Sequence, residues 1–290
     1  MVVDLNKLEH LVAVAEEGSF TRAAARLHLS QQALSSSIRA LEREIGVDLL
    51  DRGGNALTVR PAGQALITDA RVLQGVARSA VQRSRRIGRG ETEVLRIGHT
   101  PAVTGGEITA LLRRAHADHP HLSTQVNQRY PDELTEQLLA GDLDLGLCRA
   151  VSPARGLTRS LLAHHRLRVA VDAEHPLAGR ERVALAELAG ETIVVWGHPG
   201  HSGYTDLLVQ HCRDAGFEPT VVRNPIQGTP PVTAVLGTEH IAFVTAAAGP
   251  AADGNVRVVD LDPPVHAPVH ALWPQHSTSE ARDLLLATEF

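Results

Sequence analysis

SFTRAAARLHLSQQALSSSIRALEREI, residues 19–45, predicts two short helices joined by a tight turn. Ser19 or Thr21 can cap the first helix, and Ser30 ends the turn where it can cap the second. The apolar residues of the second helix recur every three or four positions and form one stripe: Leu34, Ile38, Leu41 and Ile45. This pattern is typical of a helix-turn-helix, whose second helix can enter a DNA major groove.

The other side of the second helix is polar and basic. Glutamine, serine and arginine at the start of an exposed helix can hydrogen-bond base edges and phosphates. The outer face of any amphipathic surface helix is polar as well, so the spacing by itself favours neither interpretation. If the segment reads DNA, the candidate contacts are Thr21, Arg22, Ser30, Gln31, Gln32, Ser35, Ser36, Arg39 and Arg43.

The flanking sequence decides between these interpretations. From Asp4 to Leu66 the chain resembles, without a gap, the amino-terminal winged helix-turn-helix of LysR-type transcriptional regulators, and GSFTRAAARLHLSQ at 18–31 is diagnostic of that family. The rest of the chain resembles the effector domain of the same family, so the resemblance covers nearly all 290 residues. The family usually has proline, arginine and threonine where this chain has Gln32, Ser36 and Arg60. Base preference therefore does not carry over.

The resemblance implies a sequence-specific DNA-binding regulator rather than an enzyme. Its partners would be an operator in double-stranded DNA, a small organic effector, further copies of the chain and, as a candidate, RNA polymerase. The copies would form a homodimer, or a homotetramer made from two dimers. We expect no catalytic residue, no cofactor, no metal ion and no membrane contact.

A small hairpin, the wing, is predicted after the second helix. Leu49–Arg52 and Ala56–Val59 flank a glycine-rich turn at 53–55. Arg52 and Arg60 are candidate phosphate contacts beside the groove, mainly because of the resemblance. Arginines on an exposed hairpin also serve solubility.

A long helix is predicted from Pro61 to about Ile87. At 1.5 Å per residue it would measure about 40 Å, too long for one small domain to cover. Its small and apolar residues repeat as heptads and form what we call the linker seam: Leu66, Ala70, Leu73, Ala77, Ala80, Ser84 and Ile87. The seam favours packing against a second copy, and the alternative is a monomeric helix lying on its own domain. The arginines at 83, 85, 86 and 89 form a basic hinge with Gly88 and Gly90.

From residue 93 onward the pattern alternates between strands and helices, which predicts a largely parallel sheet. The expected strands are 94–98, 123–128, 143–148, 165–171, 192–196, 220–223, 241–245 and 265–273. The expected helices are 101–117, 132–140, 204–215, 229–236 and 280–290. Two α/β lobes joined by crossovers resemble the type 2 periplasmic-binding fold.

The predicted fold class is therefore multidomain. An all-α winged helix-turn-helix at 1–60 is followed by a linker helix at 61–90 and an α/β two-lobed domain at 91–290. Lobe I would comprise 91–161 and 265–290, and lobe II would comprise 162–264.

An effector cleft is expected where strand ends lead into helix N-termini, because free backbone N–H groups there favour anions such as carboxylates. Four such segments supply the candidate contacts: His99, Thr100, Arg129, Trp196, His198, Ser202, Gln227 and Thr229. Thr100, Ser202 and Thr229 could equally be simple helix caps, and Arg129 could project into water. The position of Thr100 matches an effector-contacting serine or threonine of the family.

Composition agrees with a soluble intracellular protein, and we expect a cytoplasmic one. No apolar run approaches the length of a membrane span, no signal peptide is visible at the start, and there are 2 cysteines. The net charge of −5 hides an asymmetry, because residues 1–90 carry +4 and the remainder −9. A basic head on an acidic body concentrates the attraction to phosphate at one end.

Rival chemistries find little support. The 16 histidines include His116, His119 and His121 but form no zinc-protease or zinc-ribbon pattern, so surface positions are favoured over metal ligands. Cys148 and Cys212 are expected to be buried thiols in different lobes rather than a peroxide switch. No nucleophile elbow, phosphate loop or dinucleotide fingerprint occurs. The alternative from another class is a ligand-binding protein or enzyme whose amino-terminal helices serve only assembly.

Overall fold

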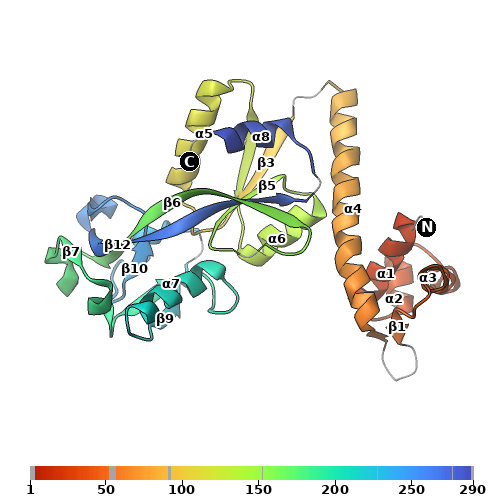
Figure 1. The fold of residues 1–290 in the computed structure, drawn as a ribbon, viewed down its shortest axis with the longest axis horizontal. Coiled ribbons are helices and arrows are strands. Elements are labelled where there is room, and N and C mark those ends of the chain that lie inside the picture. The colour runs from red at the N-terminus through yellow and green to blue at the C-terminus, as the bar shows by residue number, and fades with distance from the viewer. Residues whose placement is uncertain are drawn as a thin grey trace.

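The structure is a computed structural model that describes residues 4–51, 57–90, 93–151, 153–226, 228–275 and 277–288, with the side chains of residues 86 and 87 excepted. A small amino-terminal domain and a two-lobed α/β domain are joined by one long helix, α4 (Pro61–Gly88), which lies between them (Figure 1). Among the described residues, no helix is long and apolar enough to span a membrane.

The amino-terminal domain consists of α1 (Leu5–Glu17), α2 (Phe20–Arg26), α3 (Gln31–Ile45) and a hairpin of β1 (Leu50–Asp51) with β2 (Thr58–Val59). Its helix boundaries follow local signals: Ser19 and Ser30 cap α2 and α3, and Gly18 and Gly46 end α1 and α3 in the left-handed conformation. The apolar stripe of α3 is buried against α1 and α2 through Leu34, Ile38 and Leu41. The antiparallel pairing of β1 with β2 confirms the predicted hairpin, whose turn lies outside the described residues.

Helix α4 packs on both domains of its own chain. Near its start Ile67 and Ala70 are buried in the core of the amino-terminal domain. Further along it lies against α6 (Pro131–Ala140), and a Cβ atom on Gly75 would stand 1.7 Å from the carbonyl oxygen of Leu139. Only glycine permits this approach.

The linker seam is therefore shorter than predicted. Ala70 is buried inside its own domain and Leu66 is partly buried beside it, so neither is available to a second copy. Leu73, Ala80 and Ser84 remain exposed and Ala77 is half-buried; we call these four residues the open seam. The side chain of Ile87 lies outside the described residues.

Lobe I contains β3 (Val94–His99), β4 (Ser123–Gln128), β5 (Leu145–Arg149), α5 (Gly105–Asp118), α6 and α8 (Glu280–Ala287). The main sheet has the order β10-β6-β12-β5-β3-β4. Strand β3 runs parallel to β4 and β5, but β12 runs antiparallel to β5 and to β6. The sheet is therefore mixed, and the prediction of a largely parallel sheet holds for β3, β4 and β5 but not for the antiparallel pairings of β12 with β5 and β6.

Two long strands cross from one lobe to the other. They are β6 (Leu157–Asp172) and β12 (Val256–Pro274), and they pair along most of their length, as Figure 1 shows at the centre of the α/β domain. The sequence predicted only parts of them, at 165–171 and 265–273. Residues 158–164 of β6 are exposed or half-buried, and the exposed residues 262–264 interrupt the apolar signal of β12.

Lobe II adds shorter elements around these strands. Its strands are β7 (Arg182–Val183), β8 (Thr192–Val195), β9 (Thr220–Arg223), β10 (Ala242–Val244) and β11 (Gly249–Ala251). Its helices are α7 (Gly203–Asp214) and the 3-10 turns η1 (Pro176–Gly179), η2 (Leu185–Leu188), η3 (Pro231–Thr233) and η4 (Ala252–Gly254).

Two predicted helices need correction. The helix expected at 229–236 is only the 3-10 turn η3, because the pair Pro230-Pro231 removes backbone donors. The helix expected from residue 101 begins at Gly105, where Thr104 and Glu107 form a capping box. Thr100 is therefore not a helix cap.

Candidate DNA-reading helix and effector cavity

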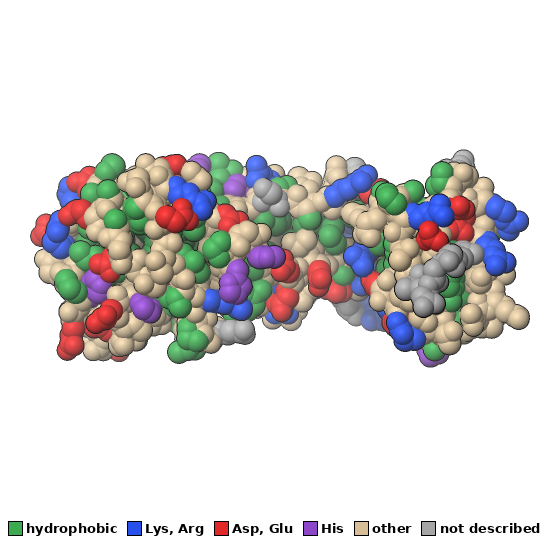
Figure 2. All heavy atoms as spheres, turned by 90° about the horizontal axis from the view of Figure 1, so that it is seen from below, with side chains coloured by type: hydrophobic (Ala, Val, Ile, Leu, Met, Phe, Trp, Pro, Cys, Tyr) green, Lys and Arg blue, Asp and Glu red, His purple; other side chains and the backbone are tan. Residues whose placement is uncertain are grey.

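The outer face of α3 is exposed along its length. Gln31, Gln32, Ser36, Arg39 and Arg43 are all exposed, opposite the buried stripe of the same helix, and Ser35 is half-buried. Figure 1 places α3 at the free end of the molecule, and Figure 2 shows basic side chains at that end. A second molecule can therefore reach this face without displacing any described part of the chain.

The other predicted DNA contacts are held by neighbouring groups. The Thr21 hydroxyl donates to Oε1 of Gln31 over 3.4 Å, so the first residue of α3 is tied to α2. Arg22 lies 3.6 Å from the Glu17 carboxylate, and the Ser30 hydroxyl accepts a hydrogen bond from the Ala33 N–H. Arg60 lies 3.6 Å from Asp48 and 3.8 Å from Asp51, which reduces the positive charge it can offer a phosphate. Arg52 lies outside the described residues.

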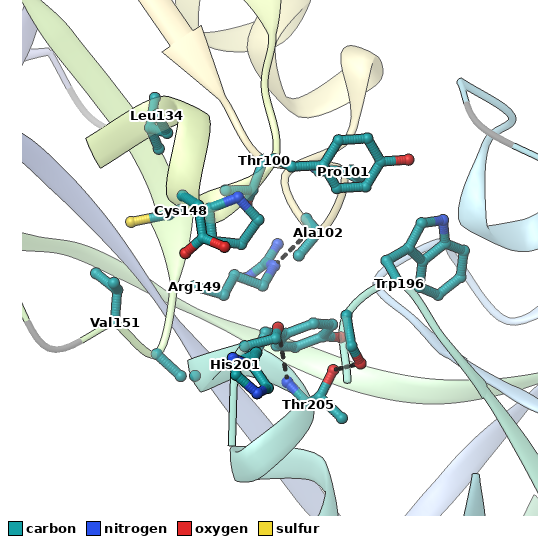
Figure 3. A pocket seen from close by; sticks show the side chains of 18 of the residues that line it. Thr100, Pro101, Ala102, Leu134, Cys148, Arg149, Val151, Trp196, His201 and Thr205 are labelled. Carbon is teal, nitrogen blue, oxygen red and sulfur yellow. Dashed lines mark hydrogen bonds between the residues drawn. The ribbon is translucent and has the colours of Figure 1, made fainter. Parts of the chain in front are cut away.

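A cavity of about 530 Å³ lies between the two lobes. Lobe I contributes the ends of β3 and β5 and the first turn of α6, while lobe II contributes the segment from Trp196 to Asp206 at the start of α7. The lobes touch beside it, because a Cβ atom on Gly203 would stand 1.9 Å from the carbonyl oxygen of Ala150. Figure 3 shows Thr100 and Arg149 facing Trp196, His201 and Thr205 across this space. Its size suits a small organic molecule.

Three of the predicted effector contacts line this cavity, namely Thr100, Trp196 and Ser202. Thr100 is buried with its backbone N–H on the carbonyl of Leu147, and Ser202 caps α7 by accepting from the Thr205 N–H. The segment before α7 is fixed at two further points. The Thr205 hydroxyl donates to the Gly197 carbonyl over 2.9 Å, and the Gly200 N–H donates to Asp206 over 2.6 Å.

Four other predicted contacts lie outside the lining. His99 turns its Nδ1 towards the carbonyl oxygen of Val103 at 2.8 Å, and His198 lies between the lining residues Gly197 and Gly200 without lining the cavity itself. Arg129 donates to Gln137 and to the carbonyl of Gln128, so it is bound along α6 instead of pointing into the cavity. The Thr229 hydroxyl donates to the carbonyl of Ile226. Gln227 lies outside the described residues.

Several lining residues were not predicted from the sequence, and Arg149 is the most informative of them. Its side chain is completely buried at the end of β5, and its Nε donates to the carbonyl of Ala102 over 2.7 Å. The signal was an arginine that directly follows an apolar strand. Tyr130, His201 and Tyr204 were also missed. They stand next to predicted contacts, where the pattern predicts a loop but not which side chains turn inward.

Arg149 belongs to a buried ionic cluster with Glu107 and His165. The guanidinium lies 2.5 Å from the Glu107 carboxylate and 3.1 Å from Nδ1 of His165, and Nδ1 of His165 is also 2.5 Å from Glu107. Burial acts to raise the pKa of Glu107, but the His165 hydrogen bond and the Arg149 charge outweigh it and lower the pKa to about 2. Glu107 is therefore ionised at neutral pH.

Comparison with known proteins identifies the family. The description "Bacterial regulatory helix-turn-helix protein, lysR family" matches residues 5–64, and "LysR substrate binding domain" matches residues 88–288. The chain belongs to the LysR family of transcriptional regulators. It is accordingly a DNA-binding transcriptional regulator with an effector-binding domain, and not an enzyme.

Individual LysR proteins match over most of their length. The uncharacterized regulator YnfL of Escherichia coli K12 is 36% identical over 213 residues, which is 72% of this chain and 71% of YnfL. BenM of Acinetobacter baylyi is 30% identical over 271 residues, or 92% of this chain and 89% of BenM. The crystal structure of CbnR matches with a TM-score of 0.61 at 23% identity over 98% of this chain and 97% of CbnR, and CbnR has also been solved with its target DNA.

The two cysteines of this LysR protein are buried and free. Burial raises the pKa of Cys148 to about 12 and that of Cys212 to about 11, so both are neutral thiols at physiological pH. The histidines visible in Figure 2 are spread over the surface. Within the described part of the chain, no three histidine, cysteine or acidic side chains are grouped so that they could hold a metal ion.

Proposed function

We propose that α3 reads the operator in the major groove. The observation that supports this is its exposed face, on which glutamine, serine and arginine side chains stand opposite a buried apolar stripe. On this proposal Gln31, Gln32, Ser35, Ser36, Arg39 and Arg43 contact bases and phosphates. Thr21, Arg22 and Ser30 position the helix beside the backbone, while Arg52 and Arg60 reach the flanking phosphates.

Arg39→Ala and Gln31→Ala should each weaken operator binding by roughly tenfold without unfolding the protein, because both side chains are exposed. If Arg39 contacts a phosphate, its loss should also reduce the slope of log K against log salt by about one. The measurement is operator affinity at several salt concentrations.

Arg113→Ala is the matched control, since Arg113 is an exposed arginine on α5 of the effector domain. It should leave both the affinity and the salt slope unchanged. If all three variants bind like the wild type at every salt concentration, α3 is not the reading helix.

Assembly and domain limits complete this part of the proposal. We propose domains at 1–60, 61–90 and 91–290, and a homodimer formed through the open seam, with a tetramer of two dimers as the larger state. The apolar side chain of Leu73 is 48% accessible on α4, and this exposure supports the assembly.

The proposed effector site is the cavity between the lobes. A small organic molecule would bridge Thr100 of lobe I and Ser202 of lobe II, beside the Trp196 ring. Helix α6 gives such binding a physical route to the DNA-binding domain. Its first turn lines the cavity through Tyr130 and Asp132, and its last residues hold α4, where Arg78 donates to the Ala140 carbonyl over 3.2 Å.

Thr100→Val and Ser202→Ala should each raise the inducer concentration needed for half-maximal transcription by roughly two- to tenfold, the cost of one hydrogen bond. The readout is a promoter–reporter response curve, recorded with an inducer found in the same reporter strain. Operator binding without inducer should not change, because both residues lie far from α3 in the fold.

Ser202 also caps α7, so the loss of a cap must be separated from the loss of a ligand contact. Ser279→Ala removes the equivalent cap from α8, outside the cavity. It should respond at wild-type inducer concentrations. A wild-type response from Thr100→Val and Ser202→Ala as well would place the effector elsewhere.

A further inference from the structure

The charged side chains of the cavity are unusual for a receptor of anions. Arg149, Asp132 and Asp206 line it, and Glu107 lies directly against Arg149. Three carboxylates therefore stand against one guanidinium. The electrostatic field inside the cavity therefore disfavours a negatively charged ligand.

Each of the three nitrogens of the Arg149 guanidinium has a partner within the protein. Its Nε donates to the Ala102 carbonyl, one terminal nitrogen lies 3.5 Å from the Ala267 carbonyl, and the other contacts both Glu107 and His165. These partners belong to lobe I and to the two crossing strands. Arg149 therefore links parts of the fold and has no free fork for a carboxylate.

The helix N-termini that open into the cavity carry their own negative charges. Asp132 and Glu133 stand in the first turn of α6, and Asp206 stands in the first turn of α7. These carboxylates already complement the positive ends of the helix dipoles. Ser202 further occupies the Thr205 N–H of α7. The attraction for anions that the strand-helix pattern predicted is thus largely satisfied within the chain.

One donor in the lining lacks an acceptor. Nε1 of Trp196 is buried and has no hydrogen-bond partner among the described residues, although the ring lines the cavity and is only 9% exposed. A buried N–H group without a partner is unfavourable, so a bound molecule with an acceptor atom at this point would be selected.

We propose that the effector of this protein carries no negative charge, being neutral or cationic, and presents a hydrogen-bond acceptor to the indole N–H of Trp196. This proposal rests on the proposed function only in taking the cavity as the effector site. It replaces the carboxylate expected from the sequence, because Arg129 lies outside the lining and Arg149 is neutralised.

Collisional quenching of Trp196 fluorescence tests the field directly, without a known effector. The chain has 2 tryptophans, so Trp273→Phe leaves Trp196 as the single reporter and keeps an aromatic ring beneath Arg282. Iodide, caesium and neutral acrylamide are compared in the full-length protein at pH 8. The Stern–Volmer quenching constant of each quencher is divided by its constant for free N-acetyltryptophanamide at equal ionic strength.

We expect the normalised iodide constant to be at least about threefold below those of caesium and acrylamide. Quenching by acrylamide alone would also support the proposal, because both ions would be excluded while a neutral molecule enters. Iodide quenching equal to or stronger than caesium quenching would overturn it. Absence of quenching by all three would show that Trp196 does not face an open cavity, which also overturns it.

Asp132→Asn should raise the iodide constant relative to caesium, whereas Asp118→Asn, an exposed carboxylate at the end of α5, should not. Equal behaviour of the two variants would contradict the assignment of the field to the cavity lining. Because this experiment uses no effector, it can contradict the proposed charge of the effector while Thr100 and Ser202 are still found to control the transcriptional response.

Discussion

Aspartate at both Leu73 and Ala80 should convert the full-length protein from a dimer to a monomer. Both side chains are exposed on α4, and a two-fold axis along the open seam would bring four carboxylates together in a desolvated contact. Operator affinity should fall by more than about a hundredfold, because a dimer reads two half-sites and a monomer reads one. Sedimentation and operator titration measure these two effects.

The geometry of α4 offers a matched control. At 100° per residue, the exposed Gln64 lies opposite Leu73 of the open seam, so Gln64→Asp adds a carboxylate to α4 away from the contact. That variant should remain dimeric. The residues of α4 that contact the end of α6, Gly75 and Ser79, lie on the side of the helix away from the open seam, so dimerisation and docking can coexist. If the Leu73 and Ala80 variant assembles normally, the dimer does not use this helix.

The sequence predicted the amino-terminal domain well because its boundaries depend on near neighbours. Ser19 and Ser30 each satisfy a backbone N–H three residues ahead, and Gly18 and Gly46 each adopt a conformation that costs other residues energy. The stripe of α3 is also a local signal, because one helix face repeats every three or four residues. Such features require no knowledge of the rest of the fold.

The cavity depends on contacts that a strand-by-strand analysis cannot see. Thr100, Trp196 and Ser202 line it because strand ends and helix starts meet there. Arg129 was expected in the cavity but lies outside it, because its side chain donates to Gln137, which is eight residues further along the chain on α6. Arg149 was missed because its partner Glu107 is 42 residues away and its other partners, at Ala102, His165 and Ala267, come from three further segments of the chain.

The same limit applies to α4. Its heptad pattern correctly predicted one long helix, but the pattern does not say which partner each position meets. Ala70 satisfies the heptad and is buried inside its own domain. Gly75, which a helix would ordinarily disfavour, is explained only by the approach of Leu139. A second copy therefore has only the residues that intramolecular packing leaves exposed.

Glu107→Gln should destabilise the effector domain by about 3 kcal/mol at pH 7, and the loss should disappear in acid. The fall of the Glu107 pKa from 4.5 to about 2 on folding corresponds to this energy, since the folded state prefers the ionised carboxylate. A lowered pKa contributes stability above the unfolded value of 4.5, and this stability is lost as the pH falls towards 2. The wild-type curve should therefore be flat above about pH 5 and decline below it.

Urea unfolding followed by tryptophan fluorescence measures this, because Trp196 and Trp273 both belong to the effector domain and report its transition alone. Glu187→Gln is the control. The pKa of Glu187 is also lowered, by the Ala184 N–H and then by Arg180, but its carboxylate is fully exposed and solvent screens it. That variant should keep the acid decline of the wild type, whereas Glu107→Gln should lose most of it. Parallel curves for Glu107→Gln and the wild type between pH 7 and pH 3 would show that the cluster with Arg149 and His165 does not stabilise the effector domain electrostatically.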